Sequence, residues 1–359
     1  MERNDPPWWD SYSNQPYKLS ADEKLDPGMA GLLEYATVGA TALLLSPMLM
    51  WRYLTLRPAE PAVDPRGFIG LSVSPDPVYE NAILDMVDDL GAEELLVRIP
   101  VWDLRNLDEY VRFVDKLNGK RVLVNVLQDR DSVKRPSLWF ESLQEILGAL
   151  SDKVEYFQLG NAINRRKWGC AHSGEYLDLL ETAENLRAMF PGARFVGSSV
   201  IDFEPLVTLR TLWNARQYSL DAVSSLLYVN RRGSPQSRQY GVFDLYNKLR
   251  LIYAMVLCGN RNARRLWITE TNWPLLDTKP YTPNSGHPSR TVDEETQADY
   301  LEQYYRIAYR TGWVERVYWW QLINPGYGLV DHRSGTLRKH PSYFALKKLV
   351  RGGLLEPGV

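Results

Sequence analysis

Residues 154–161 read VEYFQLGN, an apolar run of strand type that ends in a glycine and an asparagine. Similar runs, rich in Val, Ile, Leu and aromatic residues, recur from residue 68 onwards, and amphipathic stretches of helical period separate them. Strands that alternate with helices in this way predict a parallel sheet joined by crossover helices. The predicted strands cover residues 68–73, 94–99, 121–126, 154–159, 194–199, 222–227, 265–270 and 316–321.

The helical stretches complete the pattern. Eight strand–helix units between residues 68 and 351 fit a (β/α)8 barrel, which typically has about 250 residues or more. The alternative is an open doubly wound sheet, but no GxGxxG or GxxxxGK[ST] motif follows any predicted strand. We therefore predict an α/β protein with one (β/α)8 barrel at residues 68–359. Its helices are expected near residues 77–90, 106–118, 137–150, 173–190, 205–216, 240–259, 293–311 and 341–351.

The amino-acid composition indicates which classes of ligand the protein could bind. Twelve Trp and 21 Tyr are many for 359 residues, and their rings are suited to stacking on flat apolar faces such as those of sugars. A net charge of −2 without a basic run argues against a nucleic-acid partner. Cys170, Cys258 and four His form no zinc-binding spacing, so we expect two reduced thiols, no metal and no cofactor.

The segment before the barrel has three parts. Residues 1–28 are polar and aperiodic and predict a flexible tail, residues 29–56 are strongly apolar, and residues 57–67 form a Pro-rich linker. At about 1.5 Å per residue, the apolar run Met29–Trp51 could cross a hydrocarbon core of about 30 Å. We predict a membrane anchor or an in-plane membrane helix.

Two residues of this apolar run favour a different interpretation. Glu34 lies inside the run and Pro47 near its end, and a carboxylate inside a membrane is costly without a partner. A helix that docks on the barrel or on another protein is therefore the alternative. The arginines after the run, at positions 52, 57 and 66, favour a barrel on the cytoplasmic side of a membrane.

Polar and aromatic residues follow the predicted strands at the end where barrel enzymes carry their chemistry. Glu270 ends the seventh strand, and a carboxylate there needs a cation and a hydroxyl to keep it ionised and oriented. Arg98 on the second strand and Tyr228 after the sixth provide these groups. The other candidates for binding a sugar are Asn125, Asn161, Trp168, Trp273 and Trp320, with Trp320 preferred over Trp319 as the inward-facing residue.

These segments resemble the motifs of clan A glycoside hydrolases, the retaining barrel enzymes that include families 5 and 39. The matching stretches are VRIPV (97–101), LGNAIN (159–164), Tyr228, ITETNWP (268–274) and YWWQL (318–322). The resemblance implies that Glu270 is the nucleophile, that Arg98 and Tyr228 support it, and that Asn161 binds the sugar 2-hydroxyl. It also implies that a tryptophan of the eighth strand stacks on the sugar.

Position 162 departs from this pattern. The resemblance places the acid/base glutamate there, but the residue is Ala162. Loss of general acid–base assistance typically costs about 10²–10⁴-fold in rate. Three explanations are open: a change introduced to trap substrate, a natural barrel that binds sugar or serves a partner, or another acid in its place. The candidate acids are Asp129, Asp202, Glu204 and His172.

The predicted function follows from these residues. We expect a retaining β-glycosidase-like barrel that acts on or binds a cell-envelope polysaccharide or glycolipid glycan. The alternative is a non-catalytic glycan-binding scaffold of a membrane-bound polysaccharide assembly complex. Arg165–Lys167 and Arg231–Arg232 could pair with anionic sugars or phosphates, or be solvated loop charges. The loop Pro274–Arg290 is long enough to be a lid or a wall of the site.

Overall fold

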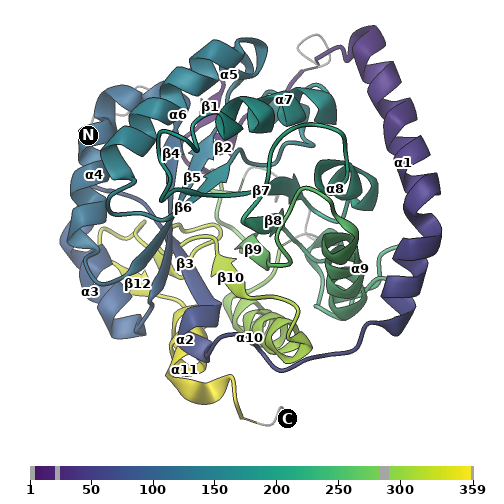
Figure 1. The fold of residues 1–359 in the computed structure, drawn as a ribbon. Helices are drawn as coiled ribbons and strands as arrows, with labels where there is room; N and C mark the ends of the chain where they lie inside the picture. The colour runs from purple at the N-terminus through teal and green to yellow at the C-terminus, as the bar shows by residue number, and fades with distance from the viewer. Residues whose placement is uncertain (1–4, 21–24, 283–290, 357–359) are drawn as a thin grey trace.

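Eight parallel strands close into a barrel in the computed structural model, which describes residues 5–20, 25–282 and 291–356. Every neighbouring pair runs parallel, and β10 pairs with both β9 and β3 to complete the ring. The predicted (β/α)8 fold is therefore confirmed (Figure 1). The strands are β3 (Ile69–Val73), β4 (Glu94–Pro100), β5 (Arg121–Leu127), β6 (Tyr156–Leu159), β7 (Arg194–Ile201), β8 (Ala222–Leu226), β9 (Leu266–Thr271) and β10 (Arg316–Trp319).

A ring of helices surrounds the barrel, close to the predicted ranges. Capping residues fix the ends of several of these helices. Asp244 and Asp293 are N-caps that accept backbone N–H groups, and Gly91 and Gly312 end helices with a positive φ. The helices are α3 (Glu80–Leu90), α4 (Leu107–Lys116), α5 (Arg130–Lys134), α6 (Pro136–Leu150), α7 (Ser173–Glu184), α8 (Pro205–Leu212), α9 (Leu245–Cys258), α10 (Glu294–Thr311) and α11 (Pro341–Lys348).

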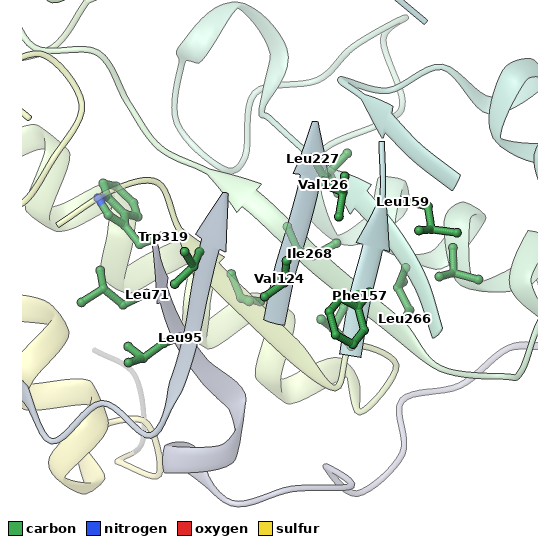
Figure 2. Close-up of a cluster of buried hydrophobic side chains, with 14 of the residues drawn as sticks. Leu71, Leu95, Val124, Val126, Phe157, Leu159, Leu227, Leu266, Ile268 and Trp319 are labelled. Atoms are coloured by element: carbon green, nitrogen blue, oxygen red, sulfur yellow. The ribbon is translucent and has the colours of Figure 1, made fainter. Parts of the chain in front are cut away.

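Alternate strand residues form two apolar layers. The outer layer joins the strands to the helices, and Figure 2 shows part of it, including Leu95, Val124 and Ile268. A second cluster contains the residues that alternate with these, among them Leu96 and Trp267. Because successive strand side chains point to opposite faces, the second cluster fills the barrel interior.

Helix α1 (Gly28–Thr55) lies against the outside of the barrel, along α8 and α9 (Figure 1). Its Glu34 faces the barrel and is only 8% exposed. Arg210 donates to both carboxylate oxygens at 2.8 and 3.1 Å, and Ser173 Oγ donates at 2.8 Å. The docked arrangement therefore provides the partner that a buried carboxylate requires.

The opposite face of α1 is apolar and exposed. Large side chains there include Leu43, Leu44 and Met29, which are 78%, 67% and 71% exposed. By length and composition alone, α1 is the one helix among the described residues that could cross a membrane. A short helix, α2 (Pro65–Phe68), follows the linker and leads into β3.

Residues 5–20 are not the flexible tail that the sequence predicts. They contain a small hairpin whose strands, β1 (Trp9–Asp10) and β2 (Gln15–Pro16), pair antiparallel. The apolar side chains explain the difference, because Trp9 is 8% exposed and packs among aromatic residues of the barrel loops. A second two-stranded sheet, β11 (Val330–Asp331) with β12 (Arg338–Lys339), lies after β10.

Candidate functional site

A cavity of about 610 Å³ contains Glu270 and lies at the carboxyl ends of the strands. Its size is within the range of about 300–1,000 Å³ that is usual for ligand sites. Loops after β6, β7, β8 and β9 form its walls together with the N-terminal hairpin. The lining residues are Ser13, Asn14, Gln15, Lys18, Arg98, Arg165, Lys167, Trp168, Ile201, Asp202, Phe203, Glu204, Tyr228, Val229, Asn230, Arg231, Arg232, Gln239, Glu270, Asn272, Pro274, Trp320 and Tyr327.

Glu270 is held by two donors from different strands. Arg98 Nη2, on β4, donates to Oε2, and Tyr228 Oη, just after β8, donates to Oε1. The Glu270 side chain is only 9% exposed, so both interactions are shielded from solvent. A cation and a hydroxyl that donate to the two oxygens of a carboxylate fix its orientation. The two donors therefore hold the Glu270 carboxylate in one position at the cavity.

Tyr228 keeps its proton in this setting. Burial, and next the nearby Glu270 carboxylate, raise the pKa of Tyr228 well above its ordinary value. The phenol is therefore a donor to Glu270 over the physiological range. The guanidinium carbon of Arg232 lies 3.3 Å from the centre of the Tyr228 ring, and Arg232 Nη1 donates to the Asn272 carbonyl at 3.2 Å. These contacts fix Arg232 at the wall of the cavity.

Trp319 ends β10 and Trp320 follows it, and the two side chains have different surroundings. Trp320 lines the cavity, and the guanidinium carbon of Arg98 lies 3.3 Å from its ring centre. Trp319 is fully buried in the outer apolar layer and stacks on Trp273, with ring centroids 6.1 Å apart and planes 22° apart. Trp320 is thus the residue that could offer a stacking face to a ligand.

Trp273 does not belong to the cavity, contrary to the prediction. It has no exposed surface, and its indole N–H donates to the Gly233 carbonyl at 2.9 Å. It also packs against Tyr300 and Tyr304 of α10. Two positions after the strand end, its side chain points into the helix layer, so it supports the loop and does not contact a ligand.

Asn125 on β5 and Asn161 just after β6 form a hydrogen bond with each other. Asn125 Nδ2 donates to Asn161 Oδ1 at 3.0 Å, and each residue is only 1% exposed. Gln128 fixes the Asn161 backbone, accepting from its N–H at 2.8 Å and donating to its carbonyl at 2.9 Å. Neither asparagine lines the cavity in this structure. Asn161 Nδ2 is buried without a hydrogen-bond partner among the described residues.

Ala162 is covered. It is fully buried in a small apolar cluster that contains Trp9, Trp168 and Tyr228. The Trp9 ring centre lies 5.8 Å from that of Trp168 and 5.0 Å from that of Trp102. The N-terminal hairpin therefore lies over position 162, where the resemblance to clan A leads us to expect an acid/base residue.

Hydrogen bonds attach the hairpin to the barrel loops. Lys167 Nζ donates to Gln15 Oε1 at 2.6 Å and to the Pro16 carbonyl at 3.1 Å. Asn324 Nδ2 donates to the Tyr12 carbonyl at 3.0 Å. The sequence analysis named Lys167 as a possible partner of anionic groups, but it missed the contacts of Lys167 with the hairpin and the contribution of Gln15 to the cavity. The available signal was the Trp8–Trp9 pair, which is unusual in an otherwise polar segment.

The four candidate replacement acids lie in different places. Asp202 and Glu204 line the cavity, but both pair with Arg165, at 2.6 and 3.2 Å. Asp129 is the N-cap of α5, and its side chain accepts from the Ser132 N–H. His172 lies beside α1 and does not line the cavity. The predicted lid loop is described only to residue 282, where Pro274 contributes to the wall; residues 283–290 lie outside the described residues.

Several solved structures with a similar fold are glycoside hydrolases. A family 39 enzyme from Bacteroides cellulosilyticus WH2 has a TM-score of 0.58 and 14% identity, covering 81% of this chain and 65% of its own. A family 5 endoglucanase from Clostridium longisporum has a TM-score of 0.57 and 11% identity, covering 80% and 97%. A family 113 β-1,4-mannanase has a TM-score of 0.52 and 16% identity, covering 80% and 98%.

These likenesses concern the fold. The chain spans slightly less than two thirds of the length of the family 39 enzyme. No protein-family model and no curated protein matches the sequence. The predicted resemblance to clan A is confirmed at the level of architecture, since families 39, 30, 5 and 113 all share this barrel. The chain is a (β/α)8 barrel, and its fold is similar to the fold of these glycoside hydrolases.

Proposed function

We propose that the barrel binds a glycan with its anomeric carbon facing Glu270, and that Glu270 can attack activated glycosides as the nucleophile of a retaining mechanism. The observation that carries this proposal is the clamp of Arg98 and Tyr228 on Glu270 inside a cavity that Trp320 lines. A retaining glycosidase needs a second carboxyl group about 5–5.5 Å away to protonate the leaving oxygen. Ala162 offers none, so ordinary glycosidic bonds should be cleaved very slowly or not at all.

The test is a kinetic assay with dinitrophenyl β-glycosides of several sugars. Dinitrophenolate leaves without acid assistance, and azide can replace the missing general base when the glycosyl–enzyme is resolved. We expect a burst of dinitrophenolate followed by turnover that azide accelerates. Glu270→Gln should abolish both, whereas the matched variant Glu204→Gln should keep them, because Glu204 is a cavity carboxylate paired with Arg165. The absence of a burst with every sugar would refute a working nucleophile.

The second candidate function is a non-catalytic glycan-binding scaffold in polysaccharide assembly. The observation in its favour is the hairpin over Ala162, which covers the side where a leaving group would be protonated. The two candidates differ in their response to restoring the carboxylate. In a latent hydrolase, Ala162→Glu combined with removal of the Trp9 ring should raise kcat for unactivated glycosides. In a scaffold, the same changes leave glycan binding intact and produce no hydrolysis.

We further propose that the outward face of α1 attaches the barrel to a membrane surface, lying in its plane. The exposed Leu43, Leu44 and Met48 support this proposal, as does the docking of the opposite face on α8 and α9. Arg52 and Arg57 follow the apolar run, and the anionic lipids of a cytoplasmic leaflet would attract them, which supports a cytoplasmic position of the barrel. Co-flotation with anionic phospholipid vesicles tests it: the wild type should float, and Leu43→Ser with Leu44→Ser should not. Flotation of both proteins alike would refute this attachment.

A further inference from the structure

The cavity carries an excess of positive charge. Six cationic side chains line it, together with three carboxylates, whereas the whole chain has a net charge of −2. The cations are Lys18, Arg98, Arg165, Lys167, Arg231 and Arg232. They come from the N-terminal hairpin, a barrel strand and two barrel loops, so the charge is a property of the assembled site and not of one basic run.

The carboxylates do not neutralise all of these cations. Glu270 pairs with Arg98, and both Asp202 and Glu204 pair with Arg165. Within the part of the chain that the structure describes, no carboxylate lies within 4.0 Å of the other four cations. Arg232 is held over the Tyr228 ring, and Lys18 and Arg231 are exposed at the rim.

Lys167 is half-buried and is held by the N-terminal hairpin. Two of its three N–H donors bond to Gln15 Oε1 and the Pro16 carbonyl, which leaves one donor for the cavity. Burial lowers the pKa of Lys167 to about 8, while the Glu270 and Asp10 charges oppose this shift. A partly desolvated ammonium without a paired anion is costly, and a ligand anion would remove that cost.

We propose that the glycan bound here is acidic, and that its carboxylate or phosphate substituent is recognised by Lys167, with Arg231, Arg232 and Lys18 at the rim. The inference rests on the proposed glycan-binding function and adds the substrate class to it. Neutral glycans would leave the four cations without counter-charges inside a concave, partly desolvated site, where charge is less screened than on an open surface.

The experiment compares matched ligands by calorimetric titration of the full chain. A β-1,4-linked tetraglucuronate differs from cellotetraose only in having carboxylates in place of hydroxymethyl groups, and cellotetraose phosphorylated at C6 provides a phosphate arm. Corresponding mannose and galactose pairs extend the panel. We expect at least one acidic member to bind about tenfold or more tightly than its neutral partner, with an affinity that falls as salt is added. The acidic member that binds best identifies the substituent.

Two groups of variants localise the effect. Lys167→Gln should weaken binding of the acidic ligand by about tenfold or more, and neutral ligands by less than about twofold. Arg231→Gln with Lys18→Gln, which leaves the hairpin contacts of Lys167 in place, should weaken acidic binding by about two- to fivefold. Arg112→Gln, an exposed arginine of α4 outside the cavity, is the control and should change neither.

The outcomes separate the two proposals. Equal binding of acidic and neutral partners would overturn the acidic-glycan inference and leave the glycan-binding function standing. Binding of no member of the panel would overturn both. Preference for acidic ligands that survives in all cavity variants would also overturn the inference, because the charge would then act from elsewhere on the surface.

Discussion

The two sides of the barrel mouth differ in the groups that they offer to a ligand. On the β9 side, Glu270 keeps a cation and a hydroxyl as partners and faces an open cavity. On the β6 side, Asn161 bonds to Asn125, Ala162 carries no functional group, and Trp9 covers the region. Under the proposed function, the side that holds the nucleophile is assembled, and the side of the acid/base position is closed. The difference means that the two halves of the proposed reaction can be tested separately in this barrel.

The largest expected effect is on the assembled side. Glu270→Gln removes the proposed nucleophile while keeping the shape and hydrogen-bonding capacity of the side chain, and it leaves Arg98 with a neutral partner. The burst rate with a dinitrophenyl glycoside should fall by about 10⁴-fold or more, as for other catalytic nucleophiles. Stopped-flow absorbance measures it. A burst that persists in Glu270→Gln would show that another residue is the nucleophile, and it would contradict the proposed difference between the two sides of the mouth.

The next effect is on the closed side. Ala162→Glu places a carboxylate in a fully buried apolar cluster, where an unpaired charge typically costs about 3–5 kcal/mol. We expect a destabilisation of about 3 kcal/mol in urea unfolding, or release of the hairpin. The same change together with Trp9→Ala should cost less, because the carboxylate then reaches water. Unchanged stability of the single variant would show that position 162 is not closed.

Removing the Trp9 side chain alone tests whether this ring holds the N-terminal hairpin on the barrel. Trp9→Ala deletes a ring that packs on Trp102 and Trp168, and large aromatic deletions cost about 3–5 kcal/mol in cores. Because the hairpin is peripheral, we expect it to open locally rather than the barrel to unfold. Amide hydrogen exchange should rise at residues 9–16, whereas β9 should stay protected. Equal exchange in the wild type and the variant would mean that the hairpin is already open in solution.

The smallest effect concerns pH and Lys167. Burial disfavours the charged form and lowers the pKa of Lys167 from its ordinary value of 10.5 to about 8. The charges of Glu270 and Asp10 raise this pKa, and the charge of Arg165 lowers it further. Above about pH 8 the ammonium is lost, so affinity for tetraglucuronate should fall while affinity for cellotetraose stays constant. Titrations from pH 7 to 9 measure this difference.

The same shift has a stability counterpart of definite sign. Between about pH 8 and 10.5 the unfolded chain holds the Lys167 proton and the folded chain does not, so this group makes stability rise with pH in that window. Lys167→Gln should lack both effects. Burial also lowers the pKa of Lys248 to about 8. Because Lys248 is still present in Lys167→Gln, the difference between the wild type and this variant isolates the contribution of Lys167. Identical pH profiles with and without Lys167 would contradict the assignment.

Local patterns were sufficient to predict the barrel. Alternation of strand and helix is repeated along the chain, so an error of a few residues at one boundary, such as the eighth strand ending at Trp319 and not at residue 321, does not change the fold. The positions of Arg98, Tyr228, Glu270 and Trp320 at the mouth also follow from strand ends. Arg98 and Glu270 lie on strands, and Tyr228 and Trp320 follow strand ends by one or two residues, so the strand positions place all four near the mouth.

Features that depend on distant contacts were not predicted. Trp9 is buried by residues about 90 and 160 positions further along the chain, and no local period in residues 5–20 indicates this. Trp273 follows a strand end as a site residue would, but it packs into the helix layer. Glu34 favoured a docked helix in the sequence analysis, but its partner Arg210, far away in sequence, could not be identified from a local pattern.

The most direct test of the central claim is intact-mass spectrometry after incubation with 2-deoxy-2-fluoro dinitrophenyl glycosides. The fluorine slows release of the glycosyl–enzyme, so a working nucleophile accumulates a covalent adduct. We expect one fluoroglycosyl unit per chain with at least one sugar, located at Glu270 by peptide mapping and absent in Glu270→Gln. No adduct with any sugar, or an adduct on another residue, would contradict the account of Glu270 as a poised nucleophile.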